Sequence, residues 1–250
     1  MEPVFESHLS ALKITPNVAD SSVSIGAMLS GKRGTAIQIF ISTTNGEFAG
    51  GAMSQGSTTV RIPVPNARLW SPDDPFLYNV QVRLFGENDK VIDQVTSYFG
   101  MRSIRLAKTS DGKLYPIFNG NFTFQYGPLD QGYWPDGIHT APTDEALKSD
   151  LVALKQLGFN LVRKHAKVEP QRWYYWADVL GLIVWQDMPS LWYPDTDSIR
   201  AQFDMNGERL LHSTIIRLLL SHGYHSMRTG AHTIWRVLRT GPKCLTQARL

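Results

Sequence analysis

Apolar and polar residues alternate along the first hundred positions of the chain. Turn-forming stretches such as Ser30–Gly34 and Ser71–Pro75 separate the alternating runs. A period of two predicts half-buried antiparallel strands, and several short strands in about 100 residues favour a β-sandwich of immunoglobulin type over residues 1–105. Three runs carry this pattern: Ile37, Ile39 and Ile41; Val60, Ile62 and Val64; Val80, Val82 and Leu84.

The pattern changes to α/β after about residue 111. Thr143 is placed to cap a helix, Pro170 to open a second one, and Gly181 to end it. A last helix is expected from about Ile199 to Leu220. Strands that alternate with helices predict a parallel barrel or a doubly wound sheet over residues 106–222. The alternating segments are helix 143–158, strand 160–163, helix 170–181 and strand 182–185.

The basic residues are concentrated in the last part of the chain. Five of the 25 Lys and Arg residues lie in residues 223–250, where no acid occurs, so the other 20 face all 22 Asp and Glu residues. The body of the protein is therefore mildly acidic. Residues 223–250 show no sustained period, and we expect an aberrant tail there.

Composition excludes several classes of protein. The single cysteine, Cys244, excludes an internal disulfide, and the histidines do not share metal-ligand spacing. No stretch approaches the roughly 20 apolar residues that span a bilayer, and the N-terminus lacks the features of a signal peptide. We expect no cofactor, metal, nucleic acid or membrane partner. Localisation and oligomeric state stay open.

Five stretches in one order resemble glycoside hydrolase family 2, which includes β-galactosidases, β-mannosidases and β-glucuronidases. The resemblance covers about residues 5–222 and implies an immunoglobulin-like sandwich followed by an incomplete (β/α)8 TIM barrel. The stretches are Leu69–Tyr78 (LWSPDDPFLY), Phe99–Ile104 (FGMRSI), Asn119–Gly120, Gly158–His165 (GFNLVRKH) and Leu182–Pro189 (LIVWQDMP).

The resemblance implies a retaining hydrolase, in which two carboxylates roughly 5–5.5 Å apart act as acid/base and nucleophile. In the family the acid/base is a Glu directly after an Asn at barrel strand four, and the nucleophile is a Glu at strand seven. Asn206-Gly207-Glu208 has the wrong order for the first, and the sequence ends before a seventh strand. We expect a truncated fragment that lacks both catalytic glutamates and also the family's N-terminal jelly roll.

A shifted reading frame is our hypothesis for the tail. One back-translation of Tyr224–Gly230, read from the third base of the preceding glycine codon, spells ISFNEDWG. This is similar to the FNEGWG pattern around the family's acid/base. Codon degeneracy leaves a chance match open, and the coding DNA after His222 would decide.

The resemblance also implies substrate-binding residues in the parent enzyme. Arg163 and His165 would lie at the carboxyl end of one barrel strand, although many members place the His three residues after the Arg instead of two. Asp187 would end the next strand, either bonding a sugar hydroxyl or pairing with Arg163. Tyr133 and Trp134 could stack on a pyranose ring or anchor their loop. Glu169 is expected only to decorate the N-terminus of a helix.

Three hypotheses follow for function. The first is a family 2 hydrolase fragment, with a β-glycoside as the parent's partner and no turnover of its own. The second is a carbohydrate- or protein-binding module built on the immunoglobulin-like sandwich. The third is a chain that hydrolyses glycosides itself.

Overall fold

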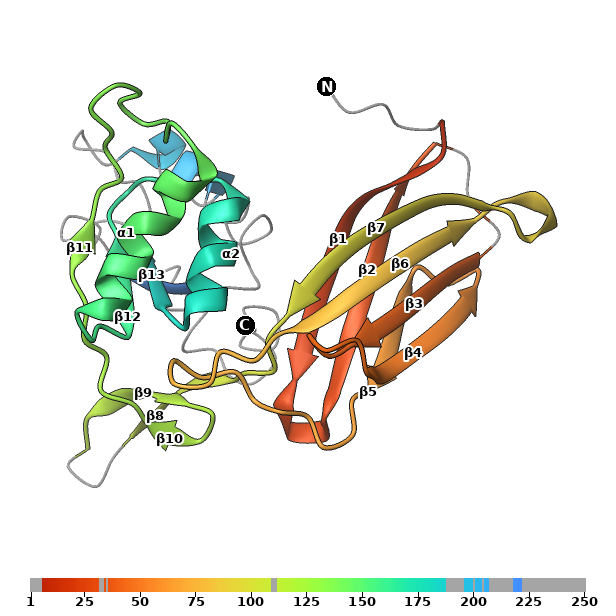
Figure 1. The fold of residues 1–250 in the computed structure, drawn as a ribbon, viewed down its shortest axis with the longest axis horizontal. Helices are drawn as coiled ribbons and strands as arrows, with labels where there is room; N and C mark the ends of the chain where they lie inside the picture. Colours follow the sequence, from red (N-terminus) through yellow and green to blue (C-terminus); the bar gives the residue numbers. More distant parts are fainter. Residues whose placement is uncertain are drawn as a thin grey trace. The chain divides into compact units, whose positions relative to one another are not determined.

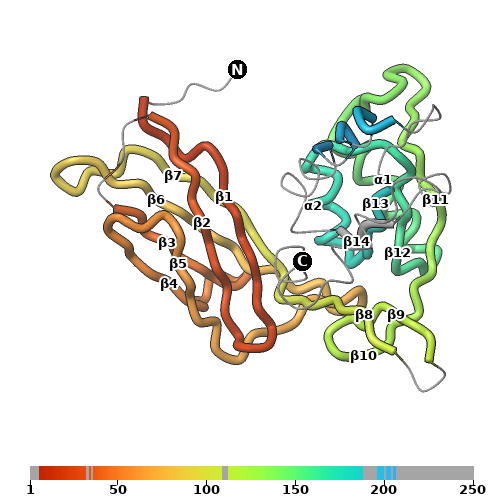
Figure 2. Tube along the Cα trace, turned by 180° about the vertical axis from the view of Figure 1, so that it is seen from behind, coloured from red at the N-terminus to blue at the C-terminus, as the bar shows by residue number. Residues whose placement is uncertain are grey.

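The chain divides into two compact units. A computed structural model describes residues 6–31, 34, 36–108, 112–187, 196–199, 201–203, 205–206 and 218–221. The first unit comprises Met1–Trp70 and Phe76–Ser103, and the second comprises Ser71–Pro75 and Ile104–Leu250 (Figures 1 and 2). The predicted tail, 223–250, lies outside the described residues, so the frameshift hypothesis stays a prediction.

The first unit is a sandwich of two antiparallel sheets, so the mostly β prediction is confirmed. One sheet has the order β1-β2-β5 and the other β4-β3-β6-β7 (Figure 1). Short 3-10 helices lie at Val18–Asp20 and Glu87–Asp89. The strands are β1 (His8–Asn17), β2 (Ser22–Ser30), β3 (Ala36–Ser42), β4 (Phe48–Gln55), β5 (Thr59–Pro63), β6 (Tyr78–Phe85) and β7 (Val91–Phe99).

Alternation of side chains builds the core of this sandwich. Successive residues of a strand point to opposite faces, so every second residue, here an apolar one, faces the other sheet. Ile14, Ile25 and Ile62 are buried on the first sheet. The second sheet buries Ile37, Ile39, Ile41, Val80, Val82 and Leu84, all named by the sequence pattern.

Trp70 belongs to the buried core of the first unit. Its side chain is fully buried, and its backbone N–H donates to the carbonyl of Met101 at 2.8 Å. The guanidinium of Arg102 lies 4.4 Å from the centre of the indole ring, in a cation–π contact. This contact joins two of the stretches that carry the family resemblance.

The second unit contains a small antiparallel sheet and a parallel sheet. Asn119 and Gly120 connect β9 and β10 with positive φ values of 48° and 85°, a turn that favours Asn-Gly. The antiparallel strands are β8 (Ile104–Lys108), β9 (Leu114–Phe118) and β10 (Asn121–Phe122). The parallel order is β11 (Leu129–Asp130), β12 (Leu161–Lys164), β13 (Ile183–Asp187) and β14 (Leu218–Ser221).

The predicted helix from Ile199 to Leu220 is wrong at its end. Residues 218–221 form β14, which runs parallel to β13 with Trp185 opposite Leu219. In the part of the chain after residue 187, helical residues are described only at 197–199, 201–203 and 205–206. A short apolar run such as Leu218–Leu220 fits a buried parallel strand as well as a helix, and pairing with β13 decides between them.

Two helices cover one face of the parallel sheet. Thr143 Oγ1 accepts a hydrogen bond from the Ala146 N–H at 3.1 Å and caps α1 (Asp144–Gln156) as predicted. The second helix, α2 (Gln171–Leu180), ends at Gly181 in the left-handed conformation. No described helix is long and apolar enough to cross a membrane. The buried cluster between helices and sheet contains Leu147, Leu151, Val162, Trp173, Tyr174, Ala177, Leu182 and Val184.

Candidate functional site

Arg163 and Asp187 meet at the carboxyl ends of two neighbouring parallel strands. The Arg163 Nε lies 3.1 Å from both carboxylate oxygens of Asp187, and its Nη2 lies 2.9 Å from Oδ2. The Asp187 side chain is only 1% exposed, whereas that of Arg163 is 37% exposed. The pair is therefore buried on its acidic side and accessible on its basic side.

His165 shares the same carboxylate. Its Nδ1 lies 2.9 Å from Asp187 Oδ2, and its side chain is 43% exposed. An ionised carboxylate only accepts hydrogen bonds, so Nδ1 carries a proton and the other ring nitrogen is directed away from Asp187. The structure thus brings three of the four predicted site residues into one group.

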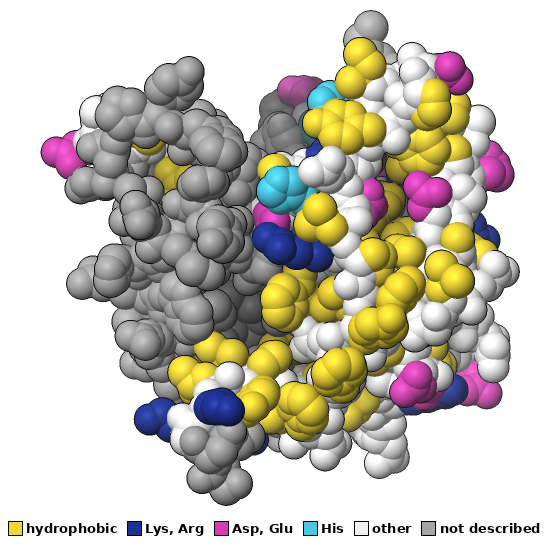
Figure 3. Space-filling model, turned by 90° about the vertical axis from the view of Figure 1, so that its left-hand side faces the viewer, with side chains coloured by type: hydrophobic (Ala, Val, Ile, Leu, Met, Phe, Trp, Pro, Cys, Tyr) yellow, Lys and Arg dark blue, Asp and Glu magenta, His cyan; other side chains and the backbone are white. Residues whose placement is uncertain are grey.

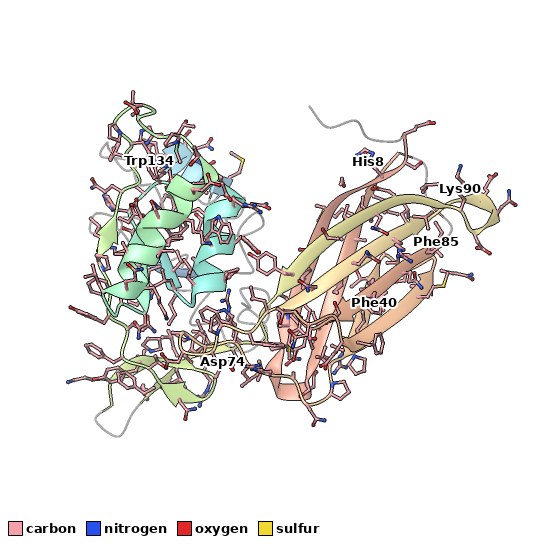
Figure 4. All side chains as sticks on the ribbon, in the orientation of Figure 1. His8, Phe40, Asp74, Phe85, Lys90 and Trp134 are labelled. Atoms are coloured by element: carbon pink, nitrogen blue, oxygen red, sulfur yellow. The ribbon has the colours of Figure 1, made fainter. Side chains whose placement is uncertain are left out.

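Trp134 packs elsewhere, against the core cluster beneath the helices. Its backbone exchanges two hydrogen bonds with Ile138, and its indole Nε1 is buried with no partner among the described residues. Figure 4 shows Trp134 near the helices of the second unit. The neighbouring Tyr133 is 64% exposed, and its ring lies 4.9 Å from that of His139. This geometry favours Trp134 as the anchor of its loop and leaves Tyr133 as the accessible ring.

A buried charge network that the sequence did not predict lies beside this group. The Nζ of Lys164 lies 2.6 Å from Asp130 Oδ2, 2.7 Å from Glu169 Oε1 and 4.5 Å from the centre of the Trp173 ring. The side chains of Lys164 and Glu169 are 1% and 2% exposed. The expectation that Glu169 only decorates a helix is wrong, because its carboxylate pairs with Lys164 and Lys167.

Strand alternation could have revealed Lys164. It follows Val162 by two residues, so both side chains face the helices, where a charge needs a partner.

On α1, burial raises the pKa of the Asp150 carboxyl, and the negative charge of Asp130 adds to this effect. In the described part of the chain, no cluster of His, Cys, Asp or Glu could hold a metal ion.

The opposite face of the parallel sheet borders a cavity of about 410 Å³. Trp185 Nε1 donates to Gln125 Oε1 at 2.6 Å, while Gln125 Nε2 is buried with no partner among the described residues. The cavity combines aromatic rings with polar groups. Its lining includes Phe122, Thr123, Gln125, Leu129, Arg163 and Trp185.

Exposed aromatic and aliphatic side chains gather near this cavity. Phe124 is 72% exposed and stacks on Tyr126 with ring centres 6.5 Å apart. Figure 3 shows hydrophobic side chains spread over the face that it presents. We call the following set the apolar strip: Leu114, Phe122, Phe124, Tyr126 and Leu129.

Comparison with known proteins identifies relatives of the chain. Residues 7–102 match the model of the glycosyl hydrolases family 2. A putative β-glucuronidase of Formosa agariphila is 28% identical over 186 residues, which are 72% of this chain and 17% of the relative. A β-galactosidase of Thermoanaerobacter pseudethanolicus is 26% identical over 192 residues, 74% of this chain and 24% of the relative.

Solved structures share the fold. The FMN-binding β-glucuronidase from Facaelibacterium prausnitzii L2-6 matches with a TM-score of 0.75 and 22% identity, over 91% of this chain and 37% of that one. The Ruminococcus gnavus β-glucuronidase in complex with D-glucuronic acid matches with a TM-score of 0.73 and 16% identity, over 86% and 36%. The chain thus spans well under half the length of these relatives. The resemblance is confirmed: residues 7–102 match the family model, and the chain is similar to members of glycoside hydrolase family 2 over most of its length.

Proposed function

We propose that this chain is part of a retaining family 2 glycoside hydrolase, which cleaves O-glycosyl bonds of a β-linked carbohydrate. The observation that carries the proposal is the group formed by Arg163, His165 and Asp187 at the carboxyl ends of β12 and β13. Active sites of barrel enzymes gather at that end of the strands.

The architecture supports the same proposal. Seven strands in two antiparallel sheets suit an immunoglobulin-like sandwich. In the sequence, α1 lies between β11 and β12, and α2 lies between β12 and β13. This alternation along a parallel sheet suits the first βα units of a TIM barrel. In this interpretation the face of the sheet that the helices leave uncovered is the inner face of the barrel.

Each site residue then has a defined task. Asp187 holds Arg163 through two hydrogen bonds and fixes the ring of His165. The exposed edges of the guanidinium and of the imidazole bind hydroxyl groups of the sugar. Trp185 and Gln125 line the adjoining cavity, so an aromatic face and an amide flank the bound ring.

Turnover by this chain alone is not expected, because neither carboxylate of the catalytic pair has a candidate. Residues 112–187 hold two glutamates, Glu145 and Glu169. Glu169 is buried between two lysines, and Glu145 is exposed in the first turn of α1. Asp187 is occupied by Arg163 and His165, so it is not available as a nucleophile.

Two assays test the proposal on the full chain. Nitrophenyl β-galactoside, β-mannoside and β-glucuronide should show no turnover, and turnover abolished by mutating a glutamate of this chain would overturn that part. Methyl β-glycosides should quench tryptophan fluorescence, because Trp185 lines the cavity.

Arg163→Met should abolish the quenching, while the control Arg172→Met, an exposed arginine of α2, should keep it. Quenching that survives Arg163→Met would instead favour a binding module on the sandwich.

A further inference from the structure

We propose that the buried pair of Lys164 and Glu169 is a positioning device, which fixes the loops after β11 and β12 so that Tyr133 and His165 face the same sugar. This inference rests on the proposed function for the identity of the ligand. The fixation of the two loops rests on geometry alone.

Lys164 joins the ends of two strands to the start of a helix. Asp130 is the last residue of β11, Lys164 is the last residue of β12, and Glu169 lies two residues before α2. A single ammonium group bonds both carboxylates over the face of Trp173. The position of each loop therefore depends on the same buried charge.

The loop after β11 rests directly on this network through Gly132. Its N–H donates to Asp130 Oδ1 at 2.7 Å, and its carbonyl accepts from Lys167 Nζ at 2.8 Å. Gly132 has a φ of 68°, and a Cβ there would lie 2.4 Å from Glu169 Oε1 and 2.9 Å from Lys164 Nζ. Only glycine lets the backbone approach so closely. The next residue is the exposed Tyr133.

The loop after β12 is held by backbone groups of two residues in the network, Asp130 and Lys167. The His165 N–H donates to the carbonyl of Asp130 at 2.8 Å, and the Lys167 N–H donates to the carbonyl of His165 at 2.7 Å. The side chain of Gln186 donates to the carbonyls of Lys167 and Asp187, both at 3.0 Å. The network is thus connected to the backbone of the residue that orients Arg163.

Stability alone does not require these charges. An apolar pair of similar volume often replaces a buried ion pair without loss of stability, because the desolvation cost of the charges disappears with them. An apolar pair cannot, however, hold Asp130 or keep Lys167 against the carbonyl of Gly132. A positioning role and a purely structural role therefore predict different results for the double replacement.

The test compares Lys164→Met/Glu169→Met with the wild-type chain and with Glu145→Gln, which removes an exposed carboxylate of α1. Hydrogen exchange is followed by mass spectrometry on peptides that cover residues 130–140 and 164–170. The double variant should keep the wild-type unfolding midpoint, yet exchange at least about tenfold faster in both peptides, as expected for loosened local structure. Wild-type exchange in both peptides would overturn the proposal.

A second variant covers the case in which the double replacement fails to fold. Lys167→Met removes the bond to Gly132 and the ion pair with Glu169, but it keeps the pair of Lys164 and Glu169. It should accelerate exchange in 130–140 while 164–170 changes less. Unchanged exchange in 130–140 would count against the device.

Quenching by a methyl β-glycoside, if wild type shows it, should weaken at least about tenfold in the double variant, since the loops lose order before binding. Absence of quenching in wild type defeats the proposed function, whereas the exchange experiment still decides on the positioning device.

Discussion

Gly100 lies so close to Trp70 that a Cβ at position 100 would come within 2.9 Å of the Trp70 Cβ and 3.1 Å of its Cγ. The indole is fully buried and Arg102 lies over its ring. The two stretches LWSPDDPFLY and FGMRSI therefore belong to one packing unit, in which the glycine leaves room for the tryptophan.

Replacing this glycine should destabilise the sandwich. Gly100→Ala places a methyl group against a side chain that has no free space, and overpacking of this kind costs about 1–3 kcal/mol. Thermal unfolding followed by circular dichroism in the β region measures the loss. An unchanged unfolding midpoint would show that the backbone shifts without cost.

Neutralising the buried carboxylate should loosen the candidate site. Asp187→Asn leaves the Arg163 guanidinium with a single acceptor oxygen in place of a carboxylate. Removal of one partner from a buried pair costs about 3–5 kcal/mol, and the partly exposed Arg163 should reduce this to about 2 kcal/mol. Urea unfolding followed by tryptophan fluorescence measures it. Asp89→Asn, on the surface of the sandwich, serves as the control and should change little.

The two aromatic residues of the loop after β11 should behave differently. Trp134→Phe removes a buried indole N–H that has no partner among the described residues, so stability should fall by less than about 1.5 kcal/mol and quenching by sugar should persist. Tyr133→Ala should weaken sugar binding about tenfold, because an exposed ring is lost. The reverse ranking in a fluorescence titration would assign the stacking role to Trp134.

Asp144, at the start of α1, should make the stability of the fold depend on pH in the acid range. Hydrogen bonds from Trp176 and Arg172 lower the pKa of Asp144 below its ordinary 3.8. A lowered folded-state pKa means that the carboxylate contributes stability above the unfolded-state pKa, and that this contribution is lost as pH falls through the folded-state value. Asp144→Asn should thus be less stable than wild type at neutral pH. The difference in unfolding midpoint should vanish at strongly acid pH, and a constant difference would contradict this origin.

Local sequence signals predicted much of this fold. The alternation of Ile37, Ile39 and Ile41 matches the inward face of β3, and the Thr143 cap matches the start of α1. These features depend on residues close together in the chain. β14 was missed because a short apolar run has no period of its own, so only its neighbour β13 decides its conformation.

The candidate site was predictable only in part. The resemblance placed Arg163, His165 and Asp187 at strand ends, and the structure brings their side chains together. The pairing of Lys164 with Asp130 could not be predicted, since Asp130 lies 34 residues away and nothing local links the two. Periodicity shows that a lysine faces the core, but it does not identify the carboxylate that neutralises it.

The apolar strip has a practical consequence for work with the purified chain. Phe124 and Tyr126 present stacked rings to water, and large exposed apolar surface on a soluble protein promotes association. The average particle mass measured by light scattering should therefore rise with protein concentration, even where circular dichroism per residue stays constant. Sugar titrations should therefore be run at low protein concentration. A second copy of the chain then does not compete with the sugar for the aromatic surface of the first.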